Sequence, residues 1–327
     1  MPLIGGVIGG NGPGFIIRDV IPFLFLFLPL FIVVHNRALI LCGVLAVGVL
    51  FGLRAGFDVS FLGGGDKLFY LANMPSVFFA AVFFAGAAVS GFAERFNVRA
   101  VLKALVFVGL AGVCLLPILE TQQRASVGVF VLSMAAVFGV YLWRHPRRVV
   151  FVLGVLVLAL VLVLPELRGV FEALGRKSEL VGMNMRAEEW RAVWAEISAH
   201  PFSLLVGKGW GATFSSPAVA GIEVNFTHGL VSSLLLKTGL VGAGMGLFYI
   251  GALGRGLLNS WREHLVLIVA LAGAILIDVF LYASFKSLDF GLMLLLAAHF
   301  GFYGDGSARG VEMNASVLYA KEDSISL

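Results

Sequence analysis

The chain has 327 residues, of which 60% are hydrophobic and 13% are charged, and its mean hydropathy is +0.99. Soluble domains are about 45–50% apolar and about 25% charged, so this composition excludes a water-soluble enzyme and predicts a membrane protein with several spans. The net charge of +4 is small and forms no basic stripe interleaved with aromatic residues, which argues against nucleic acid as a partner.

Apolar stretches that are long enough to cross a bilayer recur along the sequence. A spanning helix needs about 20 mostly apolar residues, and we count about nine candidates on that basis. They cover residues 20–34, 38–53, 74–92, 100–119, 125–142, 149–164, 228–249, 265–282 and 284–302. The sequence therefore predicts an all-α, polytopic integral membrane helix bundle.

Lys and Arg are unevenly distributed between the two sides of this predicted bundle. The richer side includes Arg95, Arg99, Arg144, Arg147 and Arg148. The positive-inside rule places that side in the cytoplasm, with the N-terminus outside and the C-terminus inside. The predicted order is an N-terminal transmembrane bundle (1–164), one long extracytoplasmic loop (165–227), C-terminal transmembrane helices (228–303) and a cytoplasmic tail (304–327).

The extracytoplasmic loop is predicted to contain an amphipathic helix. Asn184 is a suitable N-cap, and Glu188 follows where acidic residues are favoured. We expect His200-Pro201 to end the helix, because the residue before a proline avoids the helical region. We expect the helix to lie on the outer membrane surface, with its tryptophans as interfacial anchors. Its apolar face consists of Trp190, Val193, Trp194 and Ile197.

Two of the six histidines face outside in this topology. His200 precedes a proline and is accounted for as a residue at a helix end. His228 lies where the loop re-enters the membrane, in the first turn of a predicted span. A helix N-terminus disfavours the imidazolium, so this ring should stay neutral and able to accept a proton. An interfacial histidine with no role is the alternative.

Cationic residues also gather on the predicted outer face. Arg124 lies at the outer start of a span, and Arg186, Arg191 and Lys208 lie in the loop. The planar fork of arginine suits phosphate oxygens, so these residues indicate an anionic ligand such as a lipid-linked diphosphate. Snorkelling of Arg124 to lipid headgroups and plain solubility of the loop account for the same charges.

Lys237 lies about 13 Å into the predicted span 228–249, at about 1.5 Å per residue. It must face the bundle or a wet cavity, because exposing it to lipid would cost several kcal/mol. Its expected partners are Asp278 and Asp289, near the outer ends of the last two spans. We favour a structural ion pair over a proton relay.

Several stretches resemble known motifs but do not have the spacing that those motifs require. Gly207-Lys-Gly-Trp-Gly211 is not a dinucleotide-binding fingerprint, and Gly63-Gly-Gly-Asp-Lys67 lacks the Walker spacing. No HExxH or paired CxxC occurs, and Cys42 and Cys114 sit inside apolar runs. We expect no metal site, no disulfide and no cofactor.

A set of motifs between residues 120 and 245 is more specific. They are Gln123-Arg-Ala-Ser126, Asn184-Met-Arg186-Ala-Glu-Glu-Trp190, His200-Pro201, Gly207-Lys-Gly209, Thr227-His228-Gly229 and Gly239-Leu-Val-Gly242. In this order and spacing they resemble the O-antigen ligase and O-antigen polymerase family of membrane glycan transferases. Two features depart from the family: Gly229 stands where an asparagine is usual, and the chain is short, as in a compact variant or an incomplete product.

The resemblance implies a metal-independent glycosyltransferase of the bacterial inner membrane. Its donor would be an oligo- or polysaccharide on a polyprenyl diphosphate, and its acceptor a second glycan or lipid A-core, at the outer face. Arg124 and Arg186 match the family's arginines and would hold the diphosphate, with Arg191 and Lys208 as secondary candidates. His228 matches its essential histidine and would remove the proton from the acceptor hydroxyl.

Two function classes remain after this comparison. The first is a glycan transferase, which is ligase-like or polymerises repeat units; only the acceptor differs between these two reactions. The second is a transporter or flippase of a lipid-linked or anionic substrate. Transporters often show inverted repeats and paired broken helices, and the sequence shows neither clearly, which favours the transferase.

Overall fold

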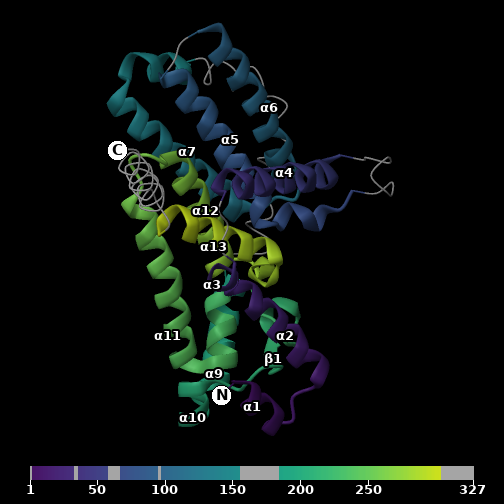
Figure 1. The fold of residues 1–327 in the computed structure, drawn as a ribbon. Helices are drawn as coiled ribbons and strands as arrows, with labels where there is room; N and C mark the ends of the chain where they lie inside the picture. The colour runs from purple at the N-terminus through teal and green to yellow at the C-terminus, as the bar shows by residue number, and fades with distance from the viewer. Residues whose placement is uncertain (1, 33–35, 58–66, 95–96, 155–183, 303–327) are drawn as a thin grey trace, which may run out of the picture.

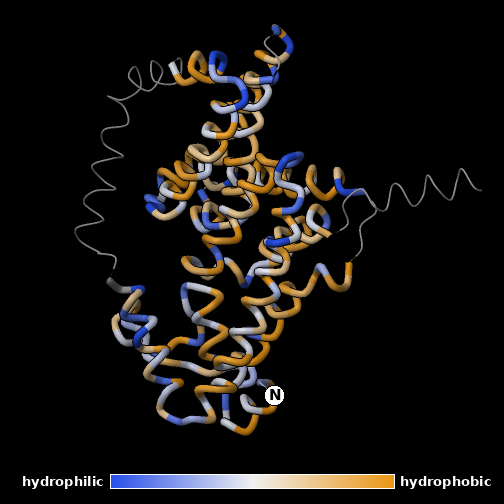
Figure 2. The backbone as a smooth tube through the Cα atoms, turned by 90° about the vertical axis from the view of Figure 1, so that its left-hand side faces the viewer, coloured by the Kyte–Doolittle hydropathy of each residue, from blue (hydrophilic) through white to orange (hydrophobic). Residues whose placement is uncertain are grey.

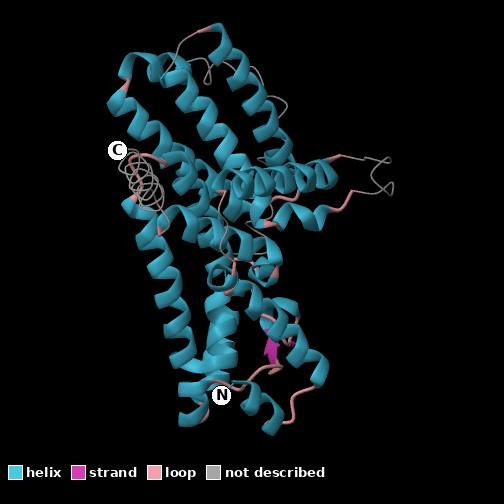
Figure 3. Ribbon diagram, in the orientation of Figure 1, coloured by secondary structure: helices cyan, strands magenta, loops and turns pink. Residues whose placement is uncertain are grey.

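The structure is a computed structural model that describes residues 2–32, 36–57, 67–94, 97–154 and 184–302. These residues are mostly helical, with one small two-stranded sheet (Figure 3). The helices and strands, in chain order, are α1 (Pro2–Ile8), α2 (Pro13–Leu26), α3 (Leu28–Phe31), α4 (Arg37–Gly56), η2 (Phe69–Asn73), α5 (Pro75–Glu94), α6 (Val98–Glu120), α7 (Arg124–Arg144), α9 (Asn184–Ser198), α10 (Pro201–Val206), β1 (Phe214–Ser216), η3 (Pro217–Val219), β2 (Ile222–Val224), α11 (Leu230–Asn259), α12 (Leu265–Phe280), η4 (Ala283–Lys286) and α13 (Leu288–Gly301).

Within the described residues, five helices are long and apolar enough to cross a membrane, namely α4, α5, α6, α7 and α11. The apolar helices α12 and α13 are shorter. Figure 2 shows apolar residues along most helices, with polar residues at helix ends and along α9. The prediction of a helical fold with several candidate membrane spans is confirmed at this level. The predicted span 149–164 lies partly outside the described residues, and so does the loop 165–227; the tail 304–327 lies wholly outside them.

The molecule is elongated, and its two ends are built from different parts of the chain. Helices α5, α6 and α7 form one end, and α1, α2, α9, α10 and the sheet form the other (Figure 1). Helices α12 and α13 lie between the two ends and supply much of the core, where Phe79, Leu271, Phe290 and Met293 are fully buried.

The predicted span 20–34 is wrong in its bounds and continuity. The helix starts earlier, at Pro13, and α2 ends at Leu26 before the short α3 begins at Leu28. Pro29 has no N–H to donate to the carbonyl of Phe25, which favours an interruption here, although α2 itself continues through Pro22. Helix α13 packs closely here, since a Cβ added to Gly291 would lie 2.5 Å from the Phe25 oxygen.

The predicted single span 228–249 is also wrong, because α11 is interrupted at Gly239. This residue has φ 63° and ψ −164°, which is not helical. A Cβ added to Gly246 would lie 2.5 Å from Leu234 Cδ1, whereas one straight helix would separate these residues by about 18 Å. Residues 230–238 and 240–259 therefore form an antiparallel helical hairpin that turns at Gly239.

The helix predicted between Asn184 and His200 is confirmed as α9, which ends at Ser198. Val193 and Ile197 are buried as expected of an apolar face, whereas Trp194 is half exposed. The chain does not stay irregular after His200, because Pro201 is the first residue of α10. Strands β1 and β2 follow as an antiparallel pair in which Phe214 faces Val224 across the ladder.

Candidate functional site

His228 is held by a buried glutamate of the loop helix. It lies just before α11, whose N-cap is Gly229. The backbone N–H of His228 donates to Glu189 Oε1 at 2.8 Å, and its ring Nδ1 lies 2.5 Å from Glu189 Oε2. The Glu189 side chain is 3% exposed and the His228 side chain is 34% exposed. The carboxylate thus anchors both the backbone and the ring of His228 while leaving part of the ring accessible.

The contact with Glu189 defines the chemistry that His228 can perform. A carboxylate accepts hydrogen bonds, so the ring nitrogen facing it carries the proton in the neutral imidazole. The other nitrogen, Nε2, then keeps its lone pair. A histidine oriented by a carboxylate in this way is the usual arrangement of a general base.

Arg186 lies three residues before Glu189, which places both on one face of α9. Its guanidinium lies 5.3 Å from the ring centroid of Tyr282, in cation–π geometry. The Tyr282 hydroxyl lies 3.4 Å from Ser126 Oγ, in the first turn of α7. Arg124, half-buried, is the first residue of the same helix. Tyr282 therefore connects the helix starts that carry the two predicted arginines.

A small cavity lies beside this connection. Tyr282, Ser126, Gln123 and Asp278 are among its lining residues. Asp278 Oδ1 accepts a hydrogen bond from Ser284 Oγ at 2.5 Å, and its Oδ2 is buried without a hydrogen-bond partner in the described structure. A small recess that contains one buried carboxylate oxygen thus adjoins the Tyr282 ring, over which Arg186 lies.

The start of α11 is pressed against the end of α12. A Cβ added to Gly229 would lie 3.0 Å from the Phe280 oxygen and 3.1 Å from the Val279 oxygen. An asparagine at this position, which the family pattern has, would require these carbonyls to move. The glycine at position 229 therefore allows the start of α11 to lie close to the end of α12.

The structure does not bring the two secondary cations to His228. Arg191 is exposed and follows Glu189 by two residues, which places it on another face of α9. Lys208 pairs with Glu196 at 2.5 Å, and its backbone N–H donates to the Leu236 oxygen. Lys208 thus lies at the far end of residues 230–238 from His228.

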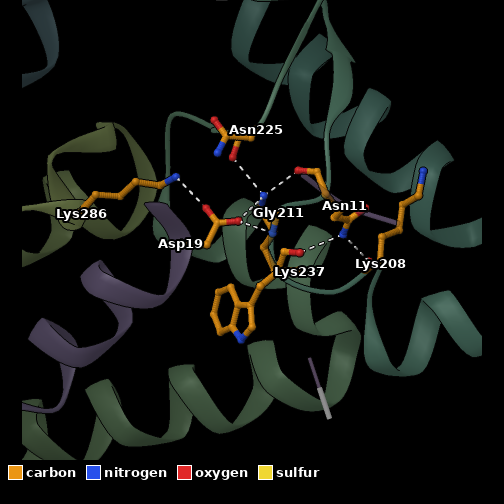
Figure 4. Close-up of polar contacts among 9 residues, drawn as sticks. Asn11, Asp19, Lys208, Gly211, Asn225, Lys237 and Lys286 are labelled. Carbon is orange, nitrogen blue, oxygen red and sulfur yellow. Dashed lines mark hydrogen bonds and ion pairs between the residues drawn. The ribbon is translucent and has the colours of Figure 1, made fainter. Parts of the chain in front are cut away.

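Lys237 forms an ion pair, but with a partner other than those predicted. Its Nζ lies 2.7 Å from Asp19 Oδ2 and donates to the backbone oxygens of Ala212 at 2.6 Å and Asn225 at 3.0 Å (Figure 4). Asp19 also accepts from Lys286 at 3.3 Å. The expected pairing with Asp278 or Asp289 is wrong, because the turn at Gly239 directs Lys237 toward α2 and the loop.

Asp289, the other expected partner, has a different role. Its Oδ2 accepts the backbone N–H of Ser76 at 2.8 Å, in the first turn of α5. A carboxylate at a helix N-terminus satisfies a free donor and interacts favourably with the helix dipole.

Two residues with buried charged contacts, Glu189 and Asp19, were not predicted from the sequence. Glu189 shares the spacing of the buried residues Val193 and Ile197, which was a usable signal that it also faces inward. Asp19 lies immediately before the predicted span 20–34, and nothing in that placement indicated burial.

Among the described residues, no group of three or more His, Cys, Asp or Glu side chains is placed to hold a metal ion. No protein-family model matches the chain, and no curated protein matches it.

Proposed function

We propose that the chain is a membrane glycan transferase that moves an oligo- or polysaccharide from a polyprenyl diphosphate to an acceptor glycan. The observation that supports this most directly is the contact of His228 with buried Glu189. A transfer to a sugar hydroxyl needs a proton acceptor of fixed orientation, and this contact supplies one.

The proposed reaction is a direct displacement at the anomeric carbon of the donor. The acceptor oxygen forms a bond to that carbon while the bond from the carbon to the diphosphate oxygen breaks. The hydroxyl proton passes to His228 Nε2, and polyprenyl diphosphate leaves with the electron pair. Arg186 and Arg124 hold the diphosphate and stabilise its developing charge.

The location that we propose is the bacterial inner membrane. In this arrangement about nine spans, with residues 240–259 in place of 228–249, put residues 165–227 outside, with the N-terminus out and the C-terminal tail in the cytoplasm. Lipid A-core as acceptor makes the protein ligase-like, and a second repeat unit makes it a polymerase. We favour the ligase-like assignment.

A transporter or flippase of a lipid-linked substrate is the alternative. The interruption of α11 at Gly239 is the observation that favours it, since transporters build substrate sites from discontinuous helices. A histidine held by a carboxylate also occurs in the proton relays of transporters. We favour the transferase because the resemblance of the motifs between residues 120 and 245 assigns His228 the role of base.

The test compares cells that lack the protein with cells that carry wild type, His228→Ala or His200→Ala. His200 is exposed at the N-cap of α10 and serves as the matched control. Lipid-linked and transferred glycans are separated by size, at equal protein levels. We expect wild type and His200→Ala to restore transferred glycan and His228→Ala to fail.

The glycan that accumulates with His228→Ala identifies the reaction. Long lipid-linked chains indicate ligation, and single lipid-linked repeat units indicate polymerisation. If His228→Ala restores the wild-type glycan pattern, His228 is not the base and the transferase mechanism is wrong.

A further inference from the structure

The recess beside Tyr282 has the size of one small guest. Its volume is about 10 Å³, and a cavity needs about 10–15 Å³ to hold one water molecule. Three segments line it: the end of α12 with Asp278 and Tyr282, the start of α7 with Gln123 and Ser126, and the start of α5 with Pro75. A sugar or a phosphate is too large for this recess, which leaves a single water molecule or a bare ion.

Asp278 brings a negative charge to the recess without a matching positive charge. Its side chain is 1% exposed. Oδ1 accepts the hydroxyl of Ser284, whereas Oδ2 is buried without a hydrogen-bond partner. None of the ion pairs within the described part of the chain involves Asp278. A buried carboxylate without a counter-charge is destabilising, so a cation in the recess would stabilise the fold.

The other buried carboxylate of this region, Asp289, is compensated differently. Its Oδ2 accepts the Ser76 N–H at the start of α5, where the helix dipole favours a negative charge. Asp278 accepts no backbone N–H in the described structure. A proton on Asp278 Oδ2 would remove the charge, but it would create a buried O–H donor that itself needs an acceptor.

Neutral oxygen atoms complete a set of ligands for a cation. Ser126 Oγ donates to Gln123 Oε1 at 3.0 Å and lies 3.4 Å from the Tyr282 hydroxyl. Hydroxyl oxygens keep lone pairs when they donate their proton, so Ser126 and Tyr282 can still bind a positive ion. A carboxylate combined with neutral oxygens is the ligand chemistry of hard cations.

We propose that this recess binds one Na⁺ ion, with Asp278 as the charged ligand and Ser126 and Tyr282 as neutral ligands. One carboxylate balances one positive charge, which favours a monovalent ion over Ca²⁺ or Mg²⁺. The volume is at the lower limit for water. This favours Na⁺, which is smaller than a water molecule without its hydration shell, over the larger K⁺.

The ion would hold the end of α12 against the start of α7. Tyr282 lies beneath the guanidinium of Arg186, and Ser126 lies in the same helical turn as Arg124. Bound Na⁺ would therefore fix the segments that carry the two arginines relative to each other. It takes no part in bond breaking, so the inference does not depend on the proposed function.

The first measurement is equilibrium binding of radioactive Na⁺ to purified wild-type protein in detergent. We expect one Na⁺ per protein, which unlabelled Na⁺ displaces and an equal concentration of K⁺ does not. Asp278→Asn should lose this binding. Asp289→Asn, which changes an equally buried carboxylate outside the recess lining, should retain it.

The second measurement is thermal unfolding in NaCl, KCl and choline chloride at equal ionic strength. At ten times the half-saturating concentration, Na⁺ should raise the Tm of wild type and Asp289→Asn by about 2 °C relative to K⁺. Asp278→Asn should have the same Tm in all three salts.

Ser126→Ala keeps the test decisive if Asp278→Asn does not fold. It removes one neutral ligand, which should raise the half-saturating Na⁺ concentration about 5-fold, the value of one hydrogen bond. The proposal is overturned if wild type binds no Na⁺ or binds K⁺ equally well. Na⁺ binding that persists unchanged in Asp278→Asn, or in Ser126→Ala where Asp278→Asn does not fold, also overturns it.

Discussion

At the scale of single residues, Glu189 gives the candidate site its chemical character. It is buried, it accepts the backbone N–H of His228, and it holds ring Nδ1. This leaves Nε2 unprotonated in the neutral ring, whose side chain is 34% exposed. Without the carboxylate, the neutral ring would populate both tautomers, and only the tautomer protonated on Nδ1 has a free lone pair on Nε2.

Glu189→Gln should therefore lower transfer while preserving the shape of the side chain. The amide oxygen can still accept the His228 N–H, but the amide NH₂ then faces Nδ1 and favours the tautomer protonated on Nε2. We expect the rate to fall by about 100-fold, at the lower end of what a general base contributes. Glu188→Gln is the matched control, and transfer rates are compared at equal protein levels. Equal rates for the two variants would show that Glu189 does not orient the base.

The individual residues of the site were only partly predictable from the sequence. Arg124, Arg186 and His228 stand out because they are polar groups at the edges of apolar stretches. The contacts of Tyr282 with Arg186 and with Ser126 are not visible in the sequence, since they join segments far apart along the chain. Glu189 was obscured by neighbouring tryptophans that fitted an amphipathic pattern equally well.

At the scale of elements, the hairpin of α11 is the feature that hydropathy cannot predict. Residues before and after Gly239 are equally apolar, so a hydropathy window merges the two arms. The conformation at Gly239 decides the fold, because φ 63° with ψ −164° is almost restricted to glycine. The backbone N–H groups of Lys208 and Gly209 then satisfy the carbonyls of Leu236 and Lys237 at the end of the first arm.

Gly239→Ala should destabilise the protein strongly. An added Cβ would lie 2.5 Å from Gly207 N and from the Leu205 oxygen, in a conformation that alanine avoids. The strained conformation alone costs about 1–3 kcal/mol, and we expect a fall in Tm of about 5 °C or more. Gly251→Ala is the control and should leave the Tm unchanged or slightly higher, because that glycine is helical and uncrowded. Thermal unfolding in detergent measures both, and equal Tm values would contradict the hairpin.

At the scale of the whole molecule, one buried ionic cluster joins distant parts of the chain. Asp19 comes from α2, Lys237 from the first arm of α11 and Lys286 from η4. Asp19 also accepts the Gly211 N–H at 2.7 Å, which adds the loop to the same cluster. Because hydropathy assigns each span separately, no sequence pattern connects these residues.

Removing Asp19 alone should lower the free energy of unfolding at least as much as removing Asp19 and Lys237 together. Asp19→Asn leaves the Lys237 ammonium buried without its counter-charge, which we expect to cost about 3–5 kcal/mol. Lys237→Met should cost less, because Asp19 keeps Lys286 as a partner. The double variant should be no less stable than Asp19→Asn alone, in thermal unfolding of all three proteins. Strictly additive losses would show that the two side chains do not interact.

The central claim is that His228 acts as the base in glycan transfer at a site shared by α7, α9 and α11. The most direct measurement uses purified protein in liposomes, with lipid-linked glycan isolated from cells that lack the protein and an acceptor glycan. Wild type should release one polyprenyl diphosphate for each glycan transferred, and His228→Ala should lower this rate by about 10²–10⁴-fold. Lipid-linked glycan that crosses the bilayer with its diphosphate bond intact would contradict the claim, as would a wild-type rate for His228→Ala.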